Sequence, residues 1–214
     1  MRLYPKTAAA AALIALGLAG CAREGDITTT GILTRYIACP PVAIASPTGD
    51  VTLFNPEGSR DASAIDVVAN ITNVRSTCDE TGEYILTQAT FDIHAQRRDP
   101  RGARDVVLPY YATVVQSGTN VVAKRVSRAG LRFEDGQLRA STRGSASSRV
   151  LRTAATLPED IRRRITRERR AGDPDAAVDP MADPAVRAAV ERARFELLVG
   201  FELSQDQLRY NATR

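Results

Sequence analysis

The sequence predicts a mainly β protein whose antiparallel strands form a sandwich, with a helical insertion near 158–194 and a short C-terminal helix. Three observations lead to this prediction. Between about residues 32 and 156, apolar and polar residues alternate in short runs that are separated by turn residues, which is typical of strands with one buried face. The alternation stops at Leu157 and returns at residues 195–203. Several short strands at this spacing favour an all-β sandwich.

The first clear strands are expected at residues 65–72 and 85–96, where apolar residues take every second position. Between them, residues 76–83 are rich in turn formers and are expected to form a loop. A second turn, at 98–102, contains Pro and Gly. A third run at 106–116 contains Pro109, and a proline inside a strand indicates an edge position or a bulge.

Two further runs follow, at 121–126 and 129–133, and they end at the hairpin signal Asp135-Gly136. Residues 137–156 alternate weakly and allow one or two exposed strands. This strand rhythm resembles that of immunoglobulin-like and fibronectin-type modules, and the resemblance concerns architecture only. The buried Trp of antibody domains is missing, since the chain has no Trp.

Helices are expected after Leu157. Pro158-Glu159-Asp160 suits a first helical turn, and Ile161 and Ile165 lie four residues apart on one face. Residues 171–184 read as a loop, and a second helix is expected from Pro184 to Arg194. The strand at 195–203 then returns to the sandwich, which makes 157–194 an insertion. Ser204 and Gln207 match a capping box, so a helix at about 205–212 should close the chain.

The N-terminus has the layout of an export signal. Arg2 and Lys6 give a basic start, and residues 8–20 form an uncharged run of small and apolar residues. This run is too short to span a membrane, which requires about 20 apolar residues, and residues 23–26 after it are charged.

The run ends in Leu18-Ala19-Gly20-Cys21, which resembles the lipobox of bacterial lipoprotein precursors. The resemblance implies that the bond before Cys21 is cut, that the Cys21 thiol carries a diacylglyceryl group and that the new amine is acylated. Residue 22 is Ala rather than Asp, which by the same resemblance favours sorting to the outer membrane, on its periplasmic face. The predicted organisation is a signal peptide at 1–20, a lipidated tether at 21–31 and one β-rich domain at 32–214.

Composition limits the partners of the mature chain. Loss of Arg2 and Lys6 lowers the formal net charge from +4 to +2, and the aromatic content is 5%. Nucleic-acid binding is therefore not expected. If Cys21 carries lipid, Cys39 and Cys78 remain, and an even pair in an exported domain predicts a disulfide. A metal or redox pair is the weaker alternative, because no Cys-x-x-Cys occurs and His94 is the only histidine.

The chain shows no motif for catalysis. His94 is expected on the solvent side of its strand, and paired carboxylates fall at turns and helix starts, so we expect no enzyme, metal or cofactor. One basic cluster is a candidate contact surface for lipid headgroups or an acidic partner. The alternative is a solvated helix face that is partly neutralised by nearby acidic residues. The cluster comprises Arg162, Arg163, Arg164, Arg167, Arg169 and Arg170.

Two functions from different classes follow from these observations. The first is a non-catalytic accessory or scaffold module of a cell-envelope complex, anchored to the membrane by lipid, with the sandwich edges and the basic cluster as contacts. The second is a carrier of lipid or a small ligand in a cavity between β and helical parts. A hydrolase is a more remote hypothesis.

Overall fold

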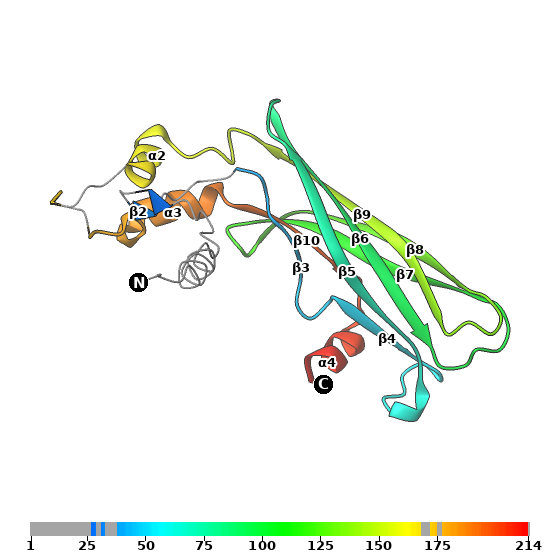
Figure 1. The fold of residues 1–214 in the computed structure, drawn as a ribbon. Coiled ribbons are helices and arrows are strands. Elements are labelled where there is room, and N and C mark those ends of the chain that lie inside the picture. Colours follow the sequence, from blue (N-terminus) through cyan, green and yellow to red (C-terminus); the bar gives the residue numbers. More distant parts are fainter. Residues whose placement is uncertain (1–26, 29–30, 33–37, 168–171, 175–176, 214) are drawn as a thin grey trace, which may run out of the picture. The chain divides into compact units, whose positions relative to one another are not determined.

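The computed structural model describes residues 27–28, 31–32, 38–167, 172–174 and 177–213 (Figure 1). The chain divides into two compact units. The smaller unit contains the two-residue strands β1 (Ile27–Thr28) and β2 (Gly31–Ile32), which pair antiparallel. The larger unit contains the other elements described below, except Thr166, the last residue of a helix, which belongs to the smaller unit. None of the helices in the described ranges is both long and apolar enough to cross a membrane. The domain boundaries derived from the sequence stay a prediction.

The larger unit consists of two four-stranded sheets (Figure 1). The first sheet has the order β3 (Val42–Ile44), β10 (Phe195–Phe201), β7 (Arg104–Gln116) and β8 (Asn120–Phe133). The second has the order β4 (Asp50–Phe54), β5 (Ile65–Asp79), β6 (Tyr84–Arg97) and β9 (Arg139–Leu151). Neighbours are antiparallel in every pair except β3 and β10. The mainly β, largely antiparallel fold is confirmed.

The alternating side chains of both sheets contribute to two hydrophobic clusters, of which the larger forms the main core of the sandwich. Phe91 on β6 and Tyr110 on β7 meet edge to face, with ring centroids 5.3 Å apart. The Tyr110 hydroxyl donates to the Ser145 carbonyl, 3.1 Å away on β9. The Phe91 ring fills the place that a Cβ would take at Gly144, so only glycine fits there. The members of this core that are at most 2% exposed are Val67, Ala69, Phe91, Ile93, Leu108, Leu131, Phe133, Val199 and Phe201.

A second close contact involves Gly200 in the first sheet and the Thr48 side chain. Gly200 on β10 pairs with Tyr111 on β7, and the Thr48 hydroxyl occupies the space that a Cβ on Gly200 would need. The same hydroxyl donates to the Ala45 carbonyl at 2.7 Å and lies 2.9 Å from the Tyr111 hydroxyl. This network ties the segment between β3 and β4 to the first sheet.

Arg97, at the end of β6, holds two loops together. The residue is 2% exposed, and its guanidinium donates to four carbonyls, at 2.5–2.9 Å. Two of these carbonyls, those of Pro100 and Gly102, belong to the loop before β7, and two, those of Glu134 and Gln137, belong to the loop before β9. The guanidinium also lies 5.3 Å from the centroid of the Phe133 ring. A buried cation is thus satisfied by backbone dipoles.

Three strand predictions need correction. Residues 76–79 are not loop but the end of β5, because their backbone pairs with β6 as far as Asp79 and Leu86. The runs 121–126 and 129–133 are one strand, β8, because the whole of β7 pairs with it. Pro109 lies in a strand with partners on both sides. The predicted edge position of Pro109 is therefore wrong. Proline is tolerated there because the pairing of β7 with β10 ends at Phe201, opposite Tyr110, so no strand pair needs an N–H from Pro109.

The helices agree with the predicted positions. Helix α2 (Glu159–Thr166) buries Ile161 and Ile165 against α3 (Pro184–Ala193), and the 3-10 turn η3 (Pro180–Ala182) precedes α3. A further 3-10 turn, η2 (Ala62–Ala64), leads into β5. Helix α4 (Gln205–Thr213) begins with the predicted capping box, in which the backbone N–H groups of Ser204 and Gln207 donate to each other's side chains.

Candidate functional site

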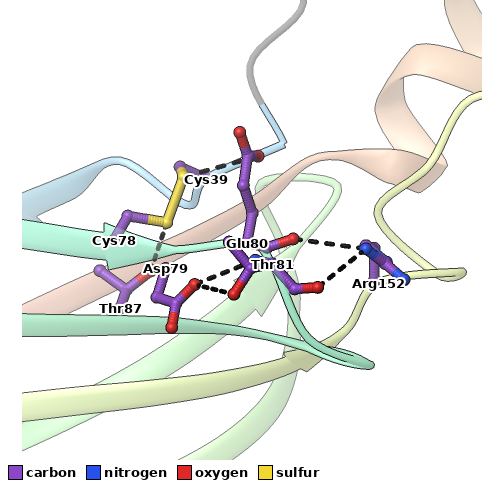
Figure 2. Close-up of a disulfide and its surroundings, with 7 residues drawn as sticks. All are labelled: Cys39, Cys78, Asp79, Glu80, Thr81, Thr87 and Arg152. Atoms are coloured by element: carbon purple, nitrogen blue, oxygen red, sulfur yellow. Dashed lines mark hydrogen bonds between the residues drawn. A yellow bond between two sulfur atoms is a disulfide. The ribbon is translucent and has the colours of Figure 1, made fainter.

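Cys39 and Cys78 form the predicted disulfide (Figure 2). Their Cα atoms are 6.1 Å apart, a usual distance for such a bridge. Cys78 lies near the end of β5 in the second sheet, and Cys39 precedes β3 of the first sheet, so the bond joins the two sheets covalently. Cys21, the predicted lipidation site, lies outside the described residues.

The hairpin beside the disulfide is held by polar contacts (Figure 2). Asp79 accepts hydrogen bonds from the backbone N–H of Thr81 at 2.9 Å and from its hydroxyl at 2.8 Å, and these bonds lower the pKa of Asp79 below 3.8. Arg152, just beyond β9, donates to the carbonyls of Glu80 and Thr81 at 3.4–3.5 Å. The Asp79 carboxylate therefore stabilises the turn between β5 and β6, and Arg152 links this turn to the end of β9.

The arginines of the predicted basic cluster lie on and after α2. Arg162 and Arg163 pair with Glu159 at the start of the helix, and Arg164 pairs with Asp183, which caps α3. These three side chains are exposed, but acidic neighbours neutralise part of their charge. Arg167 follows the helix, whereas Arg169 and Arg170 lie outside the described residues. The contact role of this cluster stays a prediction.

His94 and two aspartates near α3 have structural explanations. His94 is exposed on the outer face of the second sheet, as expected. Asp179 and Asp183 each accept a backbone N–H at 2.8 Å, at the starts of η3 and α3. Arg164 and this capping bond lower the pKa of Asp183 below 3.8. Within the described ranges, no three His, Cys, Asp or Glu side chains are placed to hold a metal ion.

A groove lies between β8 and β9, and we call it the edge groove. Its walls are formed by the first half of β8, the second half of β9 and parts of β6, β7 and β10. Apolar side chains such as Val114, Val150 and Phe195 line it, and its volume is about 750 Å³. This volume is in the usual range for ligand sites.

The inner row of β8 shows why the groove is open. Phe133, Leu131 and Ala129 are buried under the second sheet, whereas Arg125 and Ala123, farther along the same row, are exposed. The register confirms that this is one row, because these residues pair with alternate, inward-facing residues of β7. The first half of β8 therefore has its inner face uncovered.

Of the buried hydroxyl groups that line the groove, one has no hydrogen-bond partner in the described structure. Ser148 on β9 is 6% exposed, yet its hydroxyl oxygen has no hydrogen-bond partner in the described structure. Nearby Thr87 also lines the groove, but its hydroxyl contacts Cys78 Sγ at 3.8 Å. A buried hydroxyl without a partner is unfavourable unless a water molecule or a ligand satisfies it.

Basic side chains lie at the rim. Lys124, Arg125 and Arg149 line the groove, and Lys124 is engaged by Glu202 at 2.8 Å. Arg149 lies over the Tyr84 ring, 3.8 Å from its centroid. Sequence reasoning missed this site. Its one signal is the Val121-Val122 pair, which interrupts the alternation in the first half of β8, and both valines are more than half exposed.

With the geometry of the edge groove described, comparison with known proteins adds no identification. No protein-family model, curated protein or solved structure matches this chain.

Proposed function

We propose that this chain is a lipid-anchored accessory module of a cell-envelope complex, held at the periplasmic face of the outer membrane and without catalytic activity. The observation that carries the proposal is Leu18-Ala19-Gly20-Cys21 at the end of a short apolar run. Two or more acyl chains on one residue give stable anchoring, because each buried CH₂ contributes about 0.8 kcal/mol.

The disulfide supports export of the folded part. Disulfides such as Cys39–Cys78 persist in oxidising compartments and are rare in a reducing cytosol. With Cys39 and Cys78 paired, the remaining cysteine of the three is Cys21. The cysteine count thus agrees with one lipidated and two bridged residues.

The folded part is best described as a β-sandwich, because inward side chains of both four-stranded sheets share one core. The immunoglobulin-like comparison rests on strand rhythm alone. A sandwich leaves sheet edges available for contacts. For an accessory module, the edge groove is the contact that the geometry supports best, since it combines apolar walls with a basic rim.

A second function has one observation in its favour. The edge groove has the volume and the apolar walls of a site for an acyl chain or another small ligand, as a carrier would need. Its open side and charged rim suit a protein partner better than a sequestered lipid. Lipid that co-purifies in a fixed ratio, detected by mass spectrometry, would favour the carrier.

The test is fractionation of cells that express the tagged full chain. We expect wild type in the outer-membrane fraction and, after crosslinking, in a larger complex. The Cys21→Ser variant should remain an uncleaved precursor outside that fraction. The Ala22→Ser variant, which leaves the lipobox intact, should behave as wild type. A soluble wild-type protein, or one that crosslinks to nothing, would contradict the proposal.

A further inference from the structure

The second sheet is one strand short opposite the first half of β8. The second sheet covers the inner row of β8 as far as Ala129, which is 5% exposed, but it does not cover Arg125 on the same row. The missing position lies beside β9, the outermost strand of the second sheet. One additional strand next to β9 would cover Ala123 and would close the edge groove.

Both strands that border the groove offer free backbone groups. In the part of the chain that the structure describes, β8 pairs only with β7 and β9 pairs only with β6. Long unpaired edges template the addition of another strand, and proteins usually protect them. Basic residues on β8 give such protection, but the strand also exposes three valines, Val121, Val122 and Val126, each by more than half.

Charge restricts the chemistry of the added strand. Together β8 and β9 carry seven basic side chains and no acidic one. Some of these charges are already compensated, as for Lys124 with Glu202 and Arg143 with Asp92. No ion pair with a described residue engages Arg125, which lies on the uncovered inner row. An occupant with carboxylates would neutralise it.

We propose that the edge groove binds an extended segment of a partner protein, which adds as a strand to the free edge of β9. Apolar side chains of this segment cover Ala123 and the partly buried Ala112, its carboxylates face Arg125, and one of its polar groups satisfies the Ser148 hydroxyl. This inference deepens the proposed accessory function and rests on it, because it names the partner of the module at that site.

The same observations disfavour two other occupants. A second copy of this chain would bring the seven basic residues of its own β8 and β9 toward those already there, and like charges in adjacent strands are destabilising. An acyl chain would fill the apolar walls but would leave the backbone groups of the edge and the Ser148 hydroxyl without partners.

The experiment is in-cell photocrosslinking with the full chain. A photoreactive amino acid replaces Ala123, inside the groove, or Asn70, an exposed control position on the outer face of the second sheet. We expect the Ala123 probe, and not the Asn70 probe, to crosslink to one partner peptide, and mass spectrometry should find that peptide rich in alternating apolar residues with carboxylates. Crosslinks to this chain itself, to lipid, equally from both positions, or to nothing would overturn the proposal.

Two substitutions test the contacts within that experiment. Arg125→Glu, at an exposed side chain, should lower the Ala123 crosslink at least tenfold without changing the thermal unfolding of the protein. Ser148→Ala should lower it by about threefold to tenfold, the usual effect of one neutral hydrogen bond. In contrast, a merely structural serine would not change the crosslink. An undiminished crosslink in Arg125→Glu would exclude the charge contact.

The test separates this inference from the proposed function. The same cells are fractionated to determine whether the chain is lipidated and lies in the outer membrane. A lipidated protein without the Ala123 crosslink would refute only the strand docking. A crosslinked protein without lipid on Cys21 would refute only the anchored function.

Discussion

Removal of the Cys39–Cys78 disulfide should destabilise the folded domain by an amount that follows from the length of the loop it closes. The two cysteines are 39 residues apart. For a loop of this length, the chain-entropy relation gives about 4 kcal/mol at 25 °C from restriction of the unfolded chain. Because most domains have an unfolding free energy of only about 5–15 kcal/mol, this is a large fraction.

The assay is equilibrium unfolding in urea, with and without a reductant, for wild type and for the Cys39→Ser/Cys78→Ser double variant. Cys78 is exposed and Cys39 is half-buried, so serine creates no large cavity at either position. We expect the double variant to lose about 4 kcal/mol. Reductant should produce a similar loss in wild type and none in the variant. A loss below about 1 kcal/mol, or equal sensitivity of both proteins to reductant, would refute the reasoning.

Three further predictions follow from the fold. Arg97→Met should cost about 3 kcal/mol or more, because four carbonyls lose a charged donor; exposed Arg139→Met is the control, and equal melting of the two variants would contradict this role. Gly200→Ala should cost about 1–3 kcal/mol in thermal unfolding, since the Thr48 hydroxyl fills the Cβ position, and an unchanged melting temperature would count against that contact. The lowered pKa of Asp183 stabilises the fold above pH 3.8, and this contribution is lost as the pH falls through the lower folded-state pKa. On acidification from about pH 7 to pH 3, the free energy of unfolding should therefore fall less in the Asp183→Asn variant than in wild type. Equal decreases in the two proteins would show that Asp183 does not make this contribution.

Much of the fold follows from local pattern. Alternation at residues 85–96 places Phe91, Ile93 and Ala95 on the buried face of β6, and the structure confirms that face. The Ser204 and Gln207 pair predicts the start of α4 within one residue. In both cases, the signal lies in residues that are close in sequence, so the periodicity of a strand or the geometry of a helix end is sufficient.

Features that depend on distant residues were not predictable in this way. Arg97 continues the alternation of β6 at a buried position, but a charged residue is not expected in a core. Its burial is explained only by the carbonyls of two loops that are distant in sequence from each other. The edge groove likewise depends on which strand of the second sheet lies opposite the first half of β8. The polar residues 76–79 read as loop, because pairing with β6 rather than composition makes them a strand.

The basic cluster illustrates the opposite case. Arg162, Arg163 and Arg164 are conspicuous in the sequence, but Glu159 and Asp183 engage them, the latter from a different helix. By contrast, Arg125 is unremarkable in the sequence and lies on an uncovered inner row. Charge in a sequence indicates a contact surface only after its internal partners are known.

The most direct test of the proposed function is mass spectrometry of the N-terminal peptide of the protein purified from its native membranes. We predict that the mature chain begins at Cys21, with a diacylglyceryl group on the thiol and an acyl chain on the amine. A mature chain that retains residues 1–20, or one that begins at an unmodified residue, would contradict the account.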